Sequence, residues 1–301
     1  MIILFFICLY FIYRHAFGAN PRRLAADDEV PEVEKYADYA RYVHERIEEI
    51  RKEPFQEMRI QARDGVRLYG RYYHRADGAP LVLMFHGYRS SCLRDGMGAF
   101  RFTEESGYNI LMVDQRAHRN SGGRTITFGI KERYDCLDWI LHMKRVCGEE
   151  TKMILIGLSM GAATVLMAAG LELPKNVKGI IADCGYSSPK DILASVIRNI
   201  KLPVGPTYFL LRLSARIYGG FDPESVSAVE ALSKATVPVL LIHGEEDRYV
   251  PCEMSRKNYE ACASEKELFI VPGADHGMSY VTDMPRYVER FTGFLHRHFE
   301  S

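Results

Sequence analysis

The sequence MILIGLSMG, at residues 153–161, joins a short apolar run to a serine that stands between two glycines. A G-x-S-x-G pattern between a buried strand and a helix is typical of a nucleophilic serine on a sharp turn. Gly157 and Gly161 leave room for the strained backbone at Ser159, and a helix starting at Met160 would point its positive end at the site. We therefore predict that Ser159 is a nucleophile.

A serine hydroxyl is a poor nucleophile without a base and an acid that orients this base. In HGEEDRYVP, which follows an apolar run, Asp247 is the predicted acid, and Glu245 and Glu246 compete for that role. In GADHG, which follows the last apolar run, His276 is the predicted base. His243 is interpreted as structural because it lies at the end of a predicted strand.

A tetrahedral intermediate needs two backbone N–H donors for its oxyanion. Met160, the residue after the predicted nucleophile, is expected to supply one of them. The sequence HGYRSS follows the apolar run at 80–86, and the backbone N–H of Tyr88 is expected to supply the other. Gly87 would let the backbone approach the substrate, and His86 is interpreted as a residue that braces this loop.

The region from residue 57 onward alternates apolar runs with helical stretches. Continuous apolar runs separated by helices are typical of a parallel sheet buried on both faces. The sequence predicts an α/β fold with a mostly parallel eight-stranded sheet, an antiparallel N-terminal hairpin and helices on both faces. The predicted strands are 58–63, 66–74, 80–86, 108–114, 153–158, 177–184, 237–243 and 268–272, and the predicted helices are 91–105, 130–146, 161–171, 252–263 and 284–298.

One stretch, at about 186–235, is too long for a single crossover helix and is predicted to hold two or three helices. Ligands bind where the strands of an open sheet end, so we expect this insertion to form a small cap over the site. The alternative is that these are ordinary packing helices. The apolar side chains that favour an acyl or aryl pocket beneath the cap are Tyr208, Phe209, Leu210 and Leu211.

The N-terminal segment differs from the rest of the chain. Residues 1–17 are predicted to be a hydrophobic anchor that associates with a membrane, residues 25–52 an amphipathic helix, and residues 57–301 the catalytic domain. The uncharged part, residues 1–13, would span only roughly 20 Å as a helix, against a bilayer core of about 30 Å. Basic residues follow the segment and none precedes it, which favours a cytoplasmic catalytic domain. A secretory signal and a buried N-terminal element are the alternatives.

The composition argues against several classes of protein. Lys plus Arg and Asp plus Glu both number 39, so the formal net charge is +0 and no basic excess favours binding to nucleic acid. The hydrophobic fraction of 47% and the charged fraction of 26% are globular values. The seven cysteines form no CxxC pair, and no Cys/His cluster has zinc-ligand spacing. We therefore expect reduced thiols, no metal and no cofactor.

The motifs HGYRSS, DQRAHRNSGG, GLSMG, HGEEDRYVP and GADHG, in this order, resemble the α/β-hydrolase superfamily over about residues 57–299. The chain looks most like cofactor-free serine esterases with a short helical cap, which are related to dienelactone hydrolases, feruloyl esterases and prolyl oligopeptidase catalytic domains. The resemblance implies an α/β-hydrolase fold and the same residue roles that the chemistry selects: Ser159 as nucleophile, Asp247 as acid, His276 as base, and Tyr88 and Met160 at the oxyanion hole.

One motif departs from the family pattern. In DQRAHRNSGG, Ala117 and Arg119 stand where glycines are usual. That loop is structural in most relatives, so we expect the departure to affect local backbone geometry only.

These observations predict a serine hydrolase that cleaves carboxylic esters of small molecules through a covalent acyl-enzyme. A peptidase or an acyltransferase with the same three residues stays open. A peptidase of the prolyl oligopeptidase kind would normally carry a large propeller domain, for which this chain has no room. A non-catalytic binding module on the same fold is the alternative from a different class.

Overall fold

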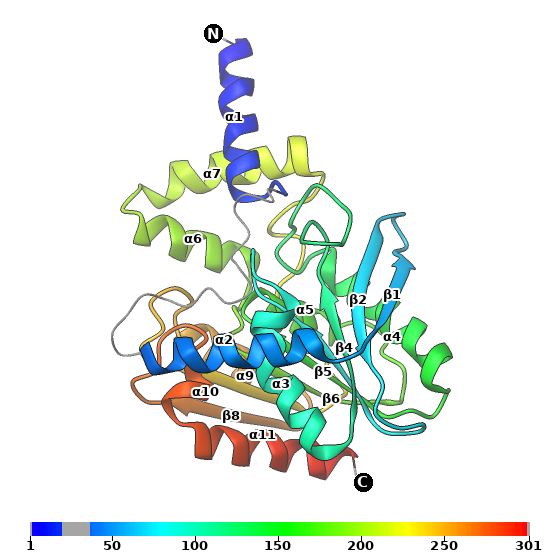
Figure 1. Cartoon of the computed structure of the whole chain (residues 1–301). Helices are drawn as coiled ribbons and strands as arrows, with labels where there is room; N and C mark the ends of the chain where they lie inside the picture. The colour runs from blue at the N-terminus through cyan, green and yellow to red at the C-terminus, as the bar shows by residue number, and fades with distance from the viewer. Residues whose placement is uncertain (1, 20–36, 300–301) are drawn as a thin grey trace.

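One mostly parallel sheet forms the centre of the molecule. The computed structural model describes residues 2–19 and 37–299, and within them eight strands lie in the order β1-β2-β4-β3-β5-β6-β7-β8 (Figure 1). β2 pairs antiparallel with β1 and β4, and the other neighbours are parallel. The predicted sheet and its N-terminal hairpin are therefore confirmed. The strands are β1 (Gln56–Gln61), β2 (Arg67–Tyr73), β3 (Leu81–Phe85), β4 (Asn109–Asp114), β5 (Met153–Leu158), β6 (Val177–Asp183), β7 (Val239–Gly244) and β8 (Lys266–Val271).

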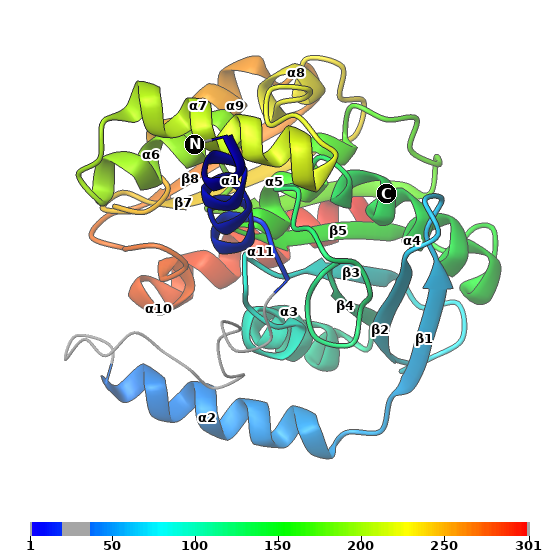
Figure 2. The same ribbon diagram turned by 90° about the horizontal axis from the view of Figure 1, so that it is seen from above.

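Helices cover both faces of the sheet, as predicted (Figure 2). α4, α5 and α9 contribute to the core on one face, and α2, α3 and α11 contribute on the other. Every residue of β3, β4 and β7 is buried, which explains why these strands read as continuous apolar runs. The helices are α2 (Ala37–Lys52), α3 (Cys92–Ser106), α4 (Glu132–Cys147), α5 (Met160–Ala168), α9 (Glu253–Ala261), α10 (Ser279–Thr282) and α11 (Met284–Phe299).

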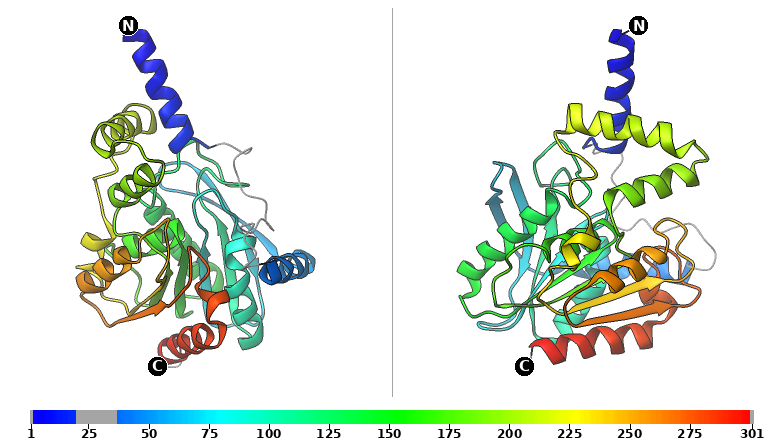
Figure 3. Two further views of the ribbon diagram at one scale, coloured as in Figure 1. Left: turned by 90° about the vertical axis from the view of Figure 1, so that its left-hand side faces the viewer. Right: turned by 180° about the vertical axis from the view of Figure 1, so that it is seen from behind.

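Helix α2 corresponds to the second part of the helix predicted over residues 25–52, and residues 25–36 lie outside the described residues. Its apolar stripe, which includes Val43, Ile47 and Ile50, is buried in the core on the α3 side. The helix therefore lies against the domain along α3 rather than extending away from it (Figure 3).

The stretch at 186–235 holds four helical elements between β6 and β7. Two of them, α6 (Pro189–Asn199) and α7 (Val204–Ser214), pack on each other, and α7 continues into a π-helical turn, η3 (Ala215–Gly219). The fourth element, α8 (Ala228–Leu232), instead packs against α5 on the main body. In Figure 1, α6 and α7 stand apart from the sheet, on the same side of the molecule as the N-terminal helix.

The N-terminal helix α1 (Ile2–Ala16) packs against α7 and η3 and projects beyond them (Figure 3). Leu9 and Tyr13 are buried, and Phe17, just after the helix, is fully buried between Phe128 and Phe221. In residues 2–19 and 37–299, no helix combines the length and the apolar character needed to cross a membrane.

Candidate active site

The turn between β5 and α5 places Ser159 at the end of the central strand. Its backbone has φ 55° and ψ −112°, a conformation that costs a non-glycine residue energy and is found mostly at functional sites. A Cβ atom on Gly157 would lie 2.2 Å from the carbonyl oxygen of Gly161, and one on Gly161 would lie 2.0 Å from that of Phe85. Only glycine fits at these two positions, which is the physical reason for the G-x-S-x-G spacing.

The structure brings together the three residues predicted to act in catalysis. His276 Nε2 lies 3.0 Å from Ser159 Oγ, and His276 Nδ1 lies 2.6 Å from Asp247 Oδ2. An ionised carboxylate can only accept hydrogen bonds, so Nδ1 carries the proton and Nε2 accepts from the serine hydroxyl. The three side chains come from the loops that follow β5, β7 and β8.

Asp247 is buried and held in its ionised form. Its Oδ1 accepts hydrogen bonds from the backbone amides of Tyr249 and Val250, at 2.9 and 2.8 Å. Burial alone would raise the pKa of this carboxyl group, but hydrogen bonds from His243 and His276 outweigh burial and lower the pKa to about 2. The competing acids considered from the sequence, Glu245 and Glu246, are both exposed to solvent.

His243 has a closer relation to this site than its interpretation as a structural residue suggests. Its ring is fully buried, and its Nε2 lies 3.2 Å from Asp247 Oδ2 and 2.8 Å from the carbonyl oxygen of Val250. Its Nδ1 lies 2.6 Å from Ser255 Oγ. His243 is therefore a second hydrogen-bond partner of the Asp247 carboxylate. The only sequence signal for this contact was that His243 stands four residues before Asp247.

The predicted oxyanion donors lie on two segments that meet beside Ser159. Met160 begins α5, so its amide is among the first N–H groups of the helix, which have no partner within it. Tyr88 follows Gly87 in the loop after β3, and a Cβ on Gly87 would lie only 3.4 Å from Ser159 Cβ. The tightest contact of such a Cβ would be with Asp95 Oδ2, at 3.2 Å, so a side chain at position 87 would crowd the loop.

Two contacts from α3 fix the same loop. Asp95 Oδ2 accepts a hydrogen bond of 2.6 Å from the amide of Gly87, and Asp95 Oδ1 accepts one of 2.7 Å from Ser90 Oγ. Both oxygens of Asp95 are therefore used to position the segment that carries Tyr88. Nothing in the sequence pattern marked Asp95 for this role.

Two buried histidines brace the loop from the other side. His86 Nε2 accepts from the amide of Gln115 at 3.0 Å, and His118 Nε2 accepts from the amide of Arg89 at 2.9 Å. Burial lowers the pKa of His86 to about 4 and that of His118 to about 3, so both rings are neutral near pH 7 and can accept.

The departures from the family pattern fall beside His118. Ala117 has φ 62° and Arg119 has φ 46°, in the left-handed region where glycine is favoured. The chain thus keeps a backbone shape suited to glycine while carrying side chains at both positions.

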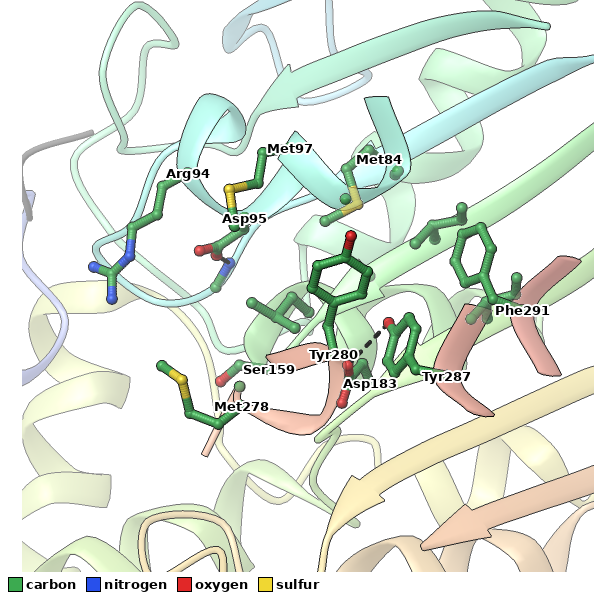
Figure 4. A pocket seen from close by; sticks show the side chains of 18 of the residues that line it. Met84, Arg94, Asp95, Met97, Ser159, Asp183, Met278, Tyr280, Tyr287 and Phe291 are labelled. Atoms are coloured by element: carbon green, nitrogen blue, oxygen red, sulfur yellow. Dashed lines mark hydrogen bonds between the residues drawn. The ribbon is translucent and has the colours of Figure 1, made fainter. Parts of the chain in front are cut away.

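A cavity of about 540 Å³ opens beside Ser159 on the face of the sheet covered by α2, α3 and α11. Figure 4 shows Ser159 and Met278 toward one end of the lining side chains and Phe291 toward the other. The sequence led us to expect an apolar pocket lined by the insertion, through Tyr208, Phe209, Leu210 and Leu211. That expectation is wrong for this cavity, because none of the four lines it.

Among the described residues, Cys184 forms with Asp247 and His276 a group of three side chains that could ligate a metal. Its Sγ and one ligand atom each of Asp247 and His276 lie within 4.8 Å of one another. Burial raises the pKa of the Cys184 thiol well above its ordinary value, whereas metals bind the thiolate. Asp247 and His276 are already hydrogen-bonded to each other, so the group is better suited to proton transfer than to metal binding.

Comparisons with known proteins agree with this geometry at the level of the fold. The chain is similar to the uncharacterized protein YqkD of Bacillus subtilis, with 27% identity over 264 residues, 87% of this chain and 85% of that protein. Among solved structures it is similar to the esterase Pf2001 of Pyrococcus furiosus, with a TM-score of 0.67, 24% identity, and coverage of 83% of this chain and 93% of that one.

A second solved structure is Est1E from Butyrivibrio proteoclasticus with ferulic acid bound, which has a TM-score of 0.64 and 20% identity. The alignment covers 81% of this chain and 100% of that one. The family model of the alpha/beta hydrolase family matches residues 82–291, the part of the chain that holds the serine turn and both loops that complete the site. The chain therefore belongs to the alpha/beta hydrolase family.

Proposed function

We propose that the protein is a serine hydrolase that cleaves carboxylic esters of small molecules. The observation that carries the proposal is the unbroken hydrogen-bonded path from Ser159 Oγ through His276 to Asp247. The 3.0 Å separation of Ser159 Oγ and His276 Nε2 is within the reach that a general base needs to take the proton of an attacking hydroxyl.

In the proposed reaction, Ser159 Oγ attacks the ester carbonyl carbon while His276 Nε2 takes the hydroxyl proton. Asp247 stabilises the resulting imidazolium, and the amides of Met160 and Tyr88 donate hydrogen bonds to the oxyanion. The C–O bond to the alcohol then breaks, and His276 returns the proton to the leaving alcohol. Water attacks the acyl-enzyme by the same route, which releases the carboxylic acid and restores Ser159.

Hydrolysis of p-nitrophenyl esters by the full chain tests this proposal. We expect Ser159→Ala to lower kcat by at least about 10⁴-fold, because the variant loses the nucleophile. Ser264→Ala is the matched control, since Ser264 lies before β8 and bonds the carbonyl oxygen of Val237. Retention of most of the activity by a folded Ser159→Ala protein would rule out the proposed mechanism.

We also propose that residues 1–17 associate with the surface of a membrane. Helix α1 carries a run of exposed apolar side chains, among which Ile2, Ile3 and Leu4 are 76%, 78% and 64% exposed. Phe209 on α7 and Ile217 on η3 are exposed apolar residues of the elements that α1 contacts. Arg14 in the last turn of α1 would favour an anionic leaflet, such as the cytoplasmic one.

A further inference from the structure

The cavity beside Ser159 has an apolar floor built by the sheet. Met84 on β3, Ile156 on β5 and Ile181 on β6 all line it. Met84 is paired in register with Ile156, and Ile156 with Ile181, so the three side chains form one row across neighbouring strands. Ile156 stands three residues before Ser159, which puts this row on the order of 10 Å from the nucleophile along the strand.

The walls of the cavity give it an elongated shape. Lining residues recur at helical spacing along α3 from Arg94 to Glu105, a distance of about 16 Å at 1.5 Å per residue. Met284, Val288 and Phe291 recur in the same way along α11. The space between the two helices is therefore a groove that leads away from Ser159 over the face of the sheet.

Helix α2 forms the roof of the groove, through Tyr39 and Val43. Tyr42 on the same helix bonds to α3 and to α10, because its hydroxyl accepts a hydrogen bond of 3.3 Å from Arg101 on α3 and lies 3.3 Å from that of Tyr280 on α10. Helix α2 thus encloses the ligand space as well as covering α3.

The four carboxyl groups on the lining already have partners, and that of Asp275 accepts a hydrogen bond of 2.7 Å from the amide of His276. Asp95 accepts from Gly87 and Ser90, as described above, and Asp183 accepts a hydrogen bond of 3.1 Å from Tyr287 (Figure 4). Glu105 is paired with Arg101 at 2.8 Å. These pairings leave the apolar side chains as the main contact surface for a ligand in the groove.

One glycine in the wall has no packing reason to be a glycine. Gly98 lies inside α3, where glycine is destabilising relative to alanine. A Cβ on Gly98 would meet no atom within 4 Å, whereas one on Gly96, two residues earlier, would lie 2.5 Å from Met112 Cε. Gly98 also lines the cavity, so its missing side chain widens the groove.

We infer that this groove binds the acyl chain of the ester and that the substrates are esters of unbranched aliphatic acids of medium or greater length. Gly98 is the residue that sets the width of the groove. The acyl group is the part of the ester that stays on Ser159 until water attacks, so an enclosed apolar groove suits it better than the alcohol, which must leave. This inference rests on the proposed function.

The test measures kcat/KM of the full chain for p-nitrophenyl esters from acetate to decanoate, so that only the acyl group changes. For the wild type we expect kcat/KM to rise by about fourfold for each methylene group until the groove is filled. For Gly98→Leu we expect the ratio of the decanoate value to the acetate value to fall by at least about 16-fold, the equivalent of two or more methylene groups.

Gly205→Leu is the matched control, because Gly205 is also a helical glycine with no atom within 4 Å of a Cβ but lies on α7, away from the groove. Gly205→Leu should keep the wild-type ratio of the decanoate value to the acetate value. Thermal melting establishes that Gly98→Leu is folded. If it is not, Gly98→Ala adds one methyl group to the same wall and should lower the ratio in the same direction.

An unchanged ratio in folded Gly98 variants, or a wild-type profile that is flat from acetate to decanoate, would overturn the inference while leaving the ester hydrolase in place. Failure of the proposed function has a different signature, in which the wild type hydrolyses none of the esters and Ser159 does not react with a fluorophosphonate.

Discussion

At the level of single residues, the strongest constraint on the site is the environment of Asp247. Two backbone amides and two histidines donate to this carboxylate or lie within ion-pair distance of it. The carboxylate in turn fixes the proton of His276 on Nδ1, which leaves Nε2 to accept from Ser159. The orientation of His276, the proposed base, therefore depends on the charge of Asp247.

We predict that Asp247→Asn lowers kcat for p-nitrophenyl esters by about 10⁴-fold, because an amide can stabilise the wrong tautomer of His276 and cannot stabilise the imidazolium. Asp275→Asn is the control. Asp275 adjoins the histidine and accepts from its backbone amide at 2.7 Å. The side-chain oxygen of asparagine can still accept this bond, so the substitution should cost less than about tenfold. Equal effects of the two substitutions would show that Asp247 does not orient the base.

Asp183 gives a prediction about stability and pH. Burial raises its pKa to about 6 from an ordinary value of 3.8. Between these two values the folded protein binds more protons than the unfolded chain, so the free energy of unfolding falls as pH rises from about 4 to 6. We expect the decrease in the free energy of unfolding between pH 4.5 and pH 7.5, as measured by urea unfolding, to be smaller in Asp183→Asn than in the wild type by on the order of 2–3 kcal/mol.

The fully exposed Asp77 offers the control for this titration. Asp77→Asn should leave the difference in unfolding free energy between the two pH values as it is in the wild type. If Asp183→Asn also leaves that difference unchanged, the carboxyl group of Asp183 does not titrate with a raised pKa.

At the level of elements, the end of α1 is joined to the loop that carries a predicted oxyanion donor. The Tyr88 hydroxyl donates to the carbonyl oxygen of Ala16 at 2.8 Å, and the guanidinium of Arg89 donates to that of His15 at 2.6 Å. Phe17 is fully buried next to these contacts. The N-terminal segment therefore helps to hold the loop after β3 in place.

We predict that deleting residues 2–19 lowers kcat by about tenfold, because the loss of these hydrogen bonds loosens the Tyr88 loop without removing its backbone donor. Deleting residues 2–5 instead, which are exposed and lie far from Tyr88 along α1, should leave kcat as in the intact chain. The measurement is kcat for one p-nitrophenyl ester with the three proteins in the same detergent. An undiminished kcat after the longer deletion would show that α1 does not hold the Tyr88 loop in place.

The sequence was sufficient to predict the elements whose surroundings are uniform. A strand such as β3 is buried on both faces, so every position is apolar and the run stands out. The turn at Ser159 was predictable because the clashes at Gly157 and Gly161 exclude every other residue. Ser159, Asp247 and His276 were predictable because each of them follows a strand of the same sheet.

The remaining features depend on how distant segments meet. The contact of His243 with Asp247 is fixed by the path of one loop. The groove is formed by α2, α3 and α11, and the apolar stripes of these helices do not indicate where two of them leave a space. Gly98 illustrates this limit, because only the empty volume beside it distinguishes it from the tightly packed Gly96.

At the level of the whole molecule, α1 and α7 present exposed apolar side chains on one side. We predict that the full chain cosediments with vesicles of phosphatidylcholine and phosphatidylserine, and that Leu4→Glu weakens binding by at least about tenfold, since a buried leucine contributes roughly 1.5–3 kcal/mol. Leu141→Glu, which changes an exposed leucine on α4, should bind like the wild type. Equal binding by the two variants would contradict a membrane-facing role for α1.

The most direct test of the central proposal is to react the folded full-length protein with a fluorophosphonate and locate the adduct by peptide mass spectrometry. A serine activated by His276 should be phosphonylated at Ser159, with labelling lost in Ser159→Ala and strongly slowed in His276→Ala. A folded wild-type protein that takes up no label, or takes it up at another residue, would contradict the assignment of Ser159 as the nucleophile.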